Sequence, residues 1–117
     1  MVYCNGVLLV GIEEFSKFEI KVGRIKGVEE IEGARSPVYK LEVFLGDVIG
    51  TRVIVAGIKN HYSKEELLNR EVVCIVNLDP KKIANVLSNG MLLAAGEEDK
   101  IVLLTPEKEI SEGSVVR

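Results

Sequence analysis

Apolar residues near the start of this chain alternate with polar ones at the two-residue period of a β-strand, and that period changes phase twice. Residues 18–22 share one phase, whereas Ile25 takes the opposite phase just after Gly23. The second change lies around Gly27, between Ile25 and Val28. Because the side chains of a strand alternate between its faces, a change of phase at a glycine predicts a bulge that redirects the strand. A strand bent twice in this way is typical of a small closed barrel.

Further short strands follow, with turn residues between them. Alternating or continuous apolar runs predict strands at residues 39–45, 52–56, 72–76, 91–95 and 101–104, and a last extended piece at 113–116. Residues 46–50 form a predicted hairpin connection. Ser63, followed three residues later by Glu66, predicts a capping box and one short helix that ends near Leu68. Three strands, a short helix and two more strands are the order of the OB-fold, so we expect an all-β, five-stranded Greek-key barrel.

Length and composition set the scale of what the chain contains. Its 117 residues are 47% apolar and 28% charged, which predicts one folded domain over residues 1–117, with a barrel core at about 15–96 and extensions at both ends. No apolar run approaches the roughly 18 residues of a membrane-spanning helix, and no leader pattern is apparent, so we expect a cytoplasmic protein without a membrane partner. Cys4 and Cys74 form no C-x-x-C pair, so we expect no metal and no cofactor, with Cys74 a small buried residue.

Charge is distributed unevenly along the sequence, although the net charge is only −3. Residues 34–64 hold five basic and two acidic side chains, whereas residues 96–112 hold two basic and six acidic ones. One interpretation is a basic face with an acidic back, and the other is ordinary mixed surface charge. The distribution matters for nucleic-acid binding, because neutralising phosphates supplies most of the affinity that is independent of sequence.

Four separate blocks carry a resemblance to a known family. They lie at residues 15–25, 52–58, 76–82 and 88–95, and the third contains Asn-Leu-Asp-Pro-Lys-Lys. Together they resemble the tRNA-binding domain family, found at the C-terminus of methionyl-tRNA synthetases, in free-standing tRNA-binding homodimers and in CsaA-like chaperones. Asp79 and Ala84 depart from the family pattern at positions where Lys and Arg are common, and residues 34–41 look like the CsaA branch. The resemblance implies an OB-fold whose terminal extensions pair two subunits.

An RNA-binding version of this fold would use the face of its second and third strands together with the flanking loops. Basic side chains there would contact phosphates, and short polar ones would bond a base edge or a 2′-hydroxyl. The candidate nucleic-acid-binding residues are Lys40, Arg52, Lys59, Asn77, Lys81, Lys82 and Ser88. Each has an alternative role, because the lysines are ordinary solvated charge in most proteins and Asn and Ser often bond turn backbone. Phe44 is either a stacking platform or, the better expectation, a core residue, and Met91 is expected in the core.

Catalysis is not predicted. The single histidine, His61, lies beside Tyr62 with no partner at a catalytic spacing and is expected in a surface loop, and no glycine-rich phosphate loop is present. The family resemblance then implies a non-catalytic homodimer that binds tRNA or other structured RNA, and that assists aminoacylation in trans with an aminoacyl-tRNA synthetase as partner. The alternative is a CsaA-like, export-related chaperone that binds unfolded polypeptides.

Overall fold

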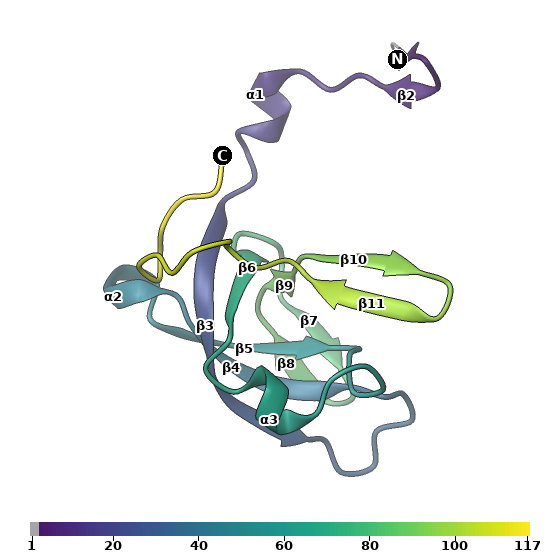
Figure 1. Ribbon diagram of the computed structural model, residues 1–117, viewed down its shortest axis with the longest axis vertical. Coiled ribbons are helices and arrows are strands. Elements are labelled where there is room, and N and C mark those ends of the chain that lie inside the picture. The colour runs from purple at the N-terminus through teal and green to yellow at the C-terminus, as the bar shows by residue number, and fades with distance from the viewer. Residues whose placement is uncertain (1–2) are drawn as a thin grey trace.

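The computed structural model describes residues 3–117 as a five-stranded antiparallel barrel with a protruding segment at the N-terminal end (Figure 1). The strand order is β5-β4-β3-β6-β9. Their bounds are β3 Ile20–Glu30, β4 Tyr39–Phe44, β5 Thr51–Ala56, β6 Glu71–Ile75 and β9 Met91–Leu92. The Asn89 amide donates to the Val53 carbonyl at 2.8 Å, which links the two ends of the sheet and nearly closes it. The predicted all-β OB-type architecture is confirmed.

The two predicted bends of β3 have different outcomes. Between Ile25 and Gly27 the register with β4 shifts by one residue, so Lys26 is extra and the second bulge is confirmed. At Gly23 the pairing with β6 continues without a shift, so the first predicted bulge is wrong. A Cβ on Gly23 would lie 2.7 Å from a Val43 side-chain carbon, so this glycine allows a close approach of two strands.

The phase change at Gly23 arises because both faces of β3 are buried there. Ile25 belongs to the core cluster inside the barrel, whereas Ile20 and Val22 are buried outside that cluster. The C-terminal segment runs along this part of β3. The Gly113 amide donates a hydrogen bond to the Val22 carbonyl at 2.7 Å, and the Val22 amide donates one to the Ser114 carbonyl at 2.9 Å. The predicted extended piece at 113–116 is thus confirmed. It lies beside β3 with an isolated bridge between Lys21 and Val115, and we refer to residues 113–116 as the added strand.

Three short helices are present where one was predicted. The capped helix is α3, Lys64–Leu67: the Ser63 hydroxyl accepts from the Glu66 amide and the Ser63 amide donates to the Glu66 carboxylate, as the sequence predicted. The additional ones are α1, Ile12–Phe15, and α2, Gly46–Ile49, which forms the predicted hairpin connection between β4 and β5. No helix within residues 3–117 has the length and apolar character needed to cross a membrane.

The core fills the barrel, and its largest fully buried side chains are Ile25, Leu41, Leu45, Ile54, Leu67, Val43, Val72 and Cys74. Burial raises the pKa of the Cys74 thiol to about 12, in agreement with its predicted role as a small hydrophobe. Two expected core residues lie elsewhere. Met91 is 45% exposed, and Phe44 is half-buried opposite Arg24 on the outer face of the sheet. The parity of Phe44 with Lys40 and Glu42 already placed it outside.

Two hairpins project from the barrel. One consists of β7, Lys81–Ile83, and β8, Val86–Ser88; the other consists of β10, Ala94–Glu97, and β11, Lys100–Leu103 (Figure 1). The predicted strand at 91–95 is therefore divided. β9 pairs with β6, whereas β10 pairs with β11. His61 lies in an exposed turn, as expected.

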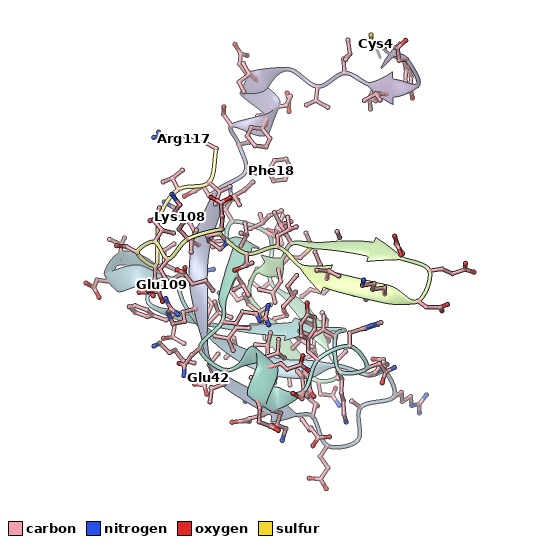
Figure 2. The ribbon with its side chains drawn as sticks, in the orientation of Figure 1. Cys4, Phe18, Glu42, Lys108, Glu109 and Arg117 are labelled. Atoms are coloured by element: carbon pink, nitrogen blue, oxygen red, sulfur yellow. The ribbon has the colours of Figure 1, made fainter. Side chains whose placement is uncertain are left out.

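The N-terminal segment, residues 3–18, extends away from the barrel, and we refer to it as the arm (Figure 1). It contains β1, Tyr3–Cys4, paired with β2, Val7–Leu8, followed by α1. Figure 2 shows Cys4 at the far end of the arm and Phe18 at its base. At the base, the side-chain nitrogen of Asn77 donates to the Lys17 carbonyl at 2.6 Å, and the side-chain oxygen of Asn77 accepts from the Glu19 backbone amide at 2.7 Å.

Candidate nucleic-acid interface

A cleft of about 430 Å³ lies at one end of the barrel, between the β3–β4 connection and the tip of the β7–β8 hairpin. We call it the loop cleft. Its lining residues are Glu32, Gly33, Ala34, Arg35, Ser36, Lys82, Ala84 and Asn85. These two connections correspond to the loops between strands one and two and between strands four and five of an OB-fold, which bind oligonucleotides in other proteins of that fold.

The tip of the β7–β8 hairpin is a two-residue turn. Ala84 and Asn85 have φ of 50° and 67°, the left-handed pair that a type I′ turn requires, and Ile83 pairs with Val86 on either side. Alanine is uncommon at positive φ, so the turn carries backbone strain at the rim of the cleft. The turn brings Lys82 and Asn85 to face the 32–36 connection.

Two cations of the loop cleft lack carboxylate partners. Arg35 and Lys82 make no ion pair within the described residues 3–117, and both side chains are exposed. Lys81, the neighbour of Lys82 on β7, is also unpaired in that part of the chain and lines the adjoining groove. These charges are available to neutralise an anion from solution.

The other predicted lysines are already neutralised by the protein. Lys40 lies 3.9 Å from a carboxylate oxygen of Glu29, and Lys59 and Lys64 both pair with Glu30, the latter at 3.4 Å. The Lys59 ammonium, through a hydrogen bond and its charge, holds the pKa of Glu30 below its ordinary value. The basic excess counted over residues 34–64 is therefore reduced, although not cancelled, by Glu29 and Glu30 of β3, which lie outside that stretch of sequence.

Arg52 projects from the other face of the sheet. It is paired with the core residue Val43, whereas Lys40 is paired with Val55, so Arg52 and Lys40 point to opposite faces. The Arg52 guanidinium donates to the Val76 carbonyl at 3.0 Å and to the Asn89 side-chain oxygen at 3.1 Å. It thereby ties β5 to the segments on either side of the β7–β8 hairpin.

The two neutral candidates bond backbone. Ser88 is buried, with 4% of its surface exposed, and its hydroxyl accepts from the Val55 amide at 2.9 Å. Asn77 secures the base of the arm through Lys17 and Glu19. Of the seven predicted residues, Lys82 lines the loop cleft. Lys81 and Ser88, which are paired across the β7–β8 hairpin, line a separate hollow, and the other four lie elsewhere on the barrel.

Sequence reasoning did not select Arg35, Asn85 or Glu32. Arg35 had been noted only as part of the local charge, and Asn85 and Glu32 lie in connections between predicted strands. The signal that could have found them is topological, since the loops that flank an OB barrel at one end converge on its ligand.

A second, apolar depression lies beside the β7–β8 hairpin, where Lys81 and Ile83 line it, whereas Lys82 and Ala84 line the loop cleft. Two hollows of about 240 and 250 Å³ share Val55 and Met91, and together we call them the apolar groove. Its other apolar lining side chains include Leu78 and Ile83 toward β7, and Ile101 and Leu103 on β11. No group of three or more His, Cys, Asp or Glu side chains suited to a metal ion occurs in residues 3–117.

Comparisons with known proteins concern nearly the whole chain. A family model described as "Putative tRNA binding domain" matches residues 20–115. Methionine–tRNA ligase of Pyrococcus furiosus is 47% identical over 108 residues, which cover 92% of this chain and 14% of the ligase. The corresponding ligase of Archaeoglobus fulgidus is 42% identical over 107 residues, or 92% of this chain and 16% of that protein. The chain thus spans only about one seventh of the length of such relatives.

Two solved structures are similar over nearly their whole length. The CsaA chaperone protein from Picrophilus torridus has a TM-score of 0.87 and 38% identity, and the match covers 93% of this chain and 100% of that one. A MetRS-related protein from Pyrococcus horikoshii has a TM-score of 0.84 and 38% identity, with coverage of 94% and 99%.

Proposed function

Because the chain belongs to the tRNA-binding domain family, we propose that it is a non-catalytic protein that binds structured RNA, tRNA above all, at the loop cleft. The observation that carries this proposal is the convergence on one cleft between two loops of Arg35 and Lys82, two cations without an ion pair in the described part of the chain. Phosphate neutralisation by such side chains supplies most of the affinity for a nucleic acid that is independent of its sequence. A cytoplasmic location follows from the proposal.

The exposed arm supports a homodimer as the active form. Its apolar side chains are largely in solvent, with Val10 64% and Ile12 73% exposed. An apolar segment of this kind on a soluble protein marks an interaction site, and a second copy of the same chain is its simplest partner. In this proposal the barrel and its end segments act as one unit over residues 1–117, and each dimer presents two loop clefts to RNA.

The similarity to methionine–tRNA ligases suggests the context in which the RNA is bound. We propose that the protein acts in trans and retains tRNA for an aminoacyl-tRNA synthetase, to which it contributes affinity rather than chemistry.

A second candidate function rests on the apolar groove. Val55 and Met91 connect two hollows into one apolar depression, which suits the side chains of an extended polypeptide. The similarity to the CsaA chaperone protein favours the same alternative, a chaperone for unfolded chains. The two functions differ in their dependence on salt, because apolar contacts are far less sensitive to ionic strength than phosphate contacts.

The deciding experiment is a titration of the purified protein with bulk tRNA at low and moderate salt, with an unfolded polypeptide as competitor. We expect saturable tRNA binding that weakens linearly on a double-logarithmic plot as salt rises. No tRNA binding at low salt would refute the RNA proposal, and salt-independent capture of the polypeptide would favour the chaperone function.

A further inference from the structure

The loop cleft contains a group that phosphate neutralisation does not explain. Glu32 is the one carboxylate among its lining residues, beside Arg35 and Lys82. A carboxylate repels phosphate, so a cleft that served only to attract phosphate would bind better without it. Glu29 and Glu30, which precede it, pair with lysines, whereas Glu32 has no ion pair within residues 3–117. Both of its oxygens remain available to accept hydrogen bonds.

The dimensions of the cleft favour a single unpaired nucleotide. Its volume of about 430 Å³ is at the lower end of the range of about 300 to 1,000 Å³ that is usual for small-ligand sites. Two loops border this open cleft. A nucleotide from an RNA loop turns its base edge outward and suits such a cleft better than an intact duplex, whose base edges are already paired. The eight lining residues include no aromatic ring, so hydrogen bonds rather than stacking must distinguish one base from another.

We propose that Glu32 is a specificity-determining residue that accepts hydrogen bonds from the Watson–Crick edge of one unpaired base, while Arg35 and Lys82 hold the neighbouring phosphates. An ionised carboxylate only accepts, so it selects bases that donate. Guanine offers its N1–H and amino group side by side to the two oxygens, and cytosine and adenine offer one amino group each. Uracil offers one N–H between two carbonyls, which repel the carboxylate. The expected order is guanine first, cytosine and adenine next, and uracil last.

The inference rests on the proposed RNA-binding function and is tested by binding to four RNA hairpins. The hairpins share one stem and a loop of seven nucleotides. The central nucleotide of the loop is G, C, A or U, and the other six are uridine. We expect the wild-type protein to bind the G hairpin about tenfold more tightly than the U hairpin, as one bidentate contact commonly provides. Glu32→Gln, which keeps the shape and removes the charge, should bring this ratio to within about twofold. Glu98→Gln, at the distant β10–β11 tip, is the matched control and should leave the ratio unchanged.

Two results would overturn the inference while leaving RNA binding intact. One is equal affinity of the wild-type protein for all four hairpins. The other is a Glu32→Gln variant that binds every hairpin more tightly by the same factor, because Glu32 would then act only by repelling phosphate. Failure to bind any hairpin or tRNA at low salt would instead refute the proposed function, and the inference with it.

Discussion

Arg24 and Arg35 carry the same charge, yet the fold gives them opposite surroundings. Arg24 is encircled by carboxylates, with Glu112 at 2.8 Å, Glu109 at 3.5 Å and Glu71 at 3.6 Å. Arg35 stands at the loop cleft without an ion pair in the described part of the chain. The charge of Arg24 is neutralised by ion pairs within the protein, whereas the charge of Arg35 is available to a ligand. The role of a cation is therefore decided by the carboxylates that the fold brings near it.

The Arg24 site fastens the C-terminal segment to the barrel. Glu109 and Glu112 belong to that segment, whereas Glu71 is a buried residue of β6, and one of its oxygens has no hydrogen-bond partner among the described residues. Figure 2 shows Glu109 on the side of the barrel where α2 lies. A buried carboxylate depends on a nearby cation to offset its lost hydration. Arg24 supplies that charge and holds the added strand in place.

The largest effect on stability is predicted when Arg24 and Arg35 are each replaced by alanine, in two separate variants. Arg24→Ala leaves Glu71 buried without its cation. The equilibrium constant for folding should therefore fall by at least about tenfold, which is measured as a lower urea midpoint. Arg35→Ala removes an exposed side chain that has no ion pair among residues 3–117, so the urea midpoint of this variant should match the wild type while its affinity for tRNA falls. Equal loss of stability in both variants would contradict the comparison.

The distinction between side chains that stabilise the fold and side chains that are available to a ligand also applies to Ser88, which is neutral. Its hydroxyl satisfies the buried Val55 amide, so Ser88→Ala should destabilise the protein by about 1 to 3 kcal/mol, the usual loss when a buried group is left unpaired. The salt dependence of tRNA binding by the folded protein should stay unchanged. Urea unfolding and a salt titration measure the two quantities separately. If Ser88→Ala kept the stability of the wild type and changed the salt dependence of tRNA binding, Ser88 would have to be assigned to the RNA-binding residues.

The succession of strands along the chain and the capped helix could be predicted from the sequence because their signals are local. The alternation of residues 39–45 and the Ser63 to Glu66 spacing each depend on neighbours within a few positions. The bend at Gly23 was misjudged because a strand buried on both faces loses its alternation. The grouping of Lys40 with Arg52 failed because the face of a residue in a strand depends on its register.

The charge of the candidate site was the least predictable feature. Counting residues 34–64 gave a basic excess, but Glu29 and Glu30 lie just outside that span and neutralise Lys40 and Lys59 in space. Only pairing between strands could reveal this. Lys81 and Lys82 stay predicted RNA-binding residues, and they lie on β7 rather than in a loop. The position of Lys82 opposite Arg35 depends on the turn at Ala84.

A smaller effect is predicted when paired and unpaired lysines are compared. Replacing Lys81 and Lys82 together with alanine should lower the slope of log affinity against log salt by about one to two units, if each lysine contacts one phosphate. Replacing Lys40 and Lys59 together is the matched control, because carboxylates already neutralise them, and the slope should change by much less. Salt titrations with one tRNA measure both variants, and equal slopes would refute the distinction between paired and unpaired charge.

The smallest predicted effect is the pH dependence of the Arg24 site. A hydrogen bond from Arg24, and then its charge, holds the pKa of Glu112 below its ordinary value of 4.5 in the folded protein. The carboxylate therefore binds its proton less tightly when folded than when unfolded. Its contribution to stability is complete above the ordinary pKa and is lost as the pH falls through the lower folded value. Salt bridges of partly exposed groups are weak, so the effect is small.

Glu112→Gln isolates this contribution. The urea midpoint of the variant should lie below that of the wild type at pH 7, and the difference should shrink as the pH falls below 4.5 toward about 3. Glu30 and Glu66 also have lowered pKa values, so both proteins lose stability in acid, and only the difference between them reports on Glu112. A difference that stays constant from pH 7 to about 3 would show that the side chain acts by packing. The fastening of the added strand would then not depend on the charge of Arg24.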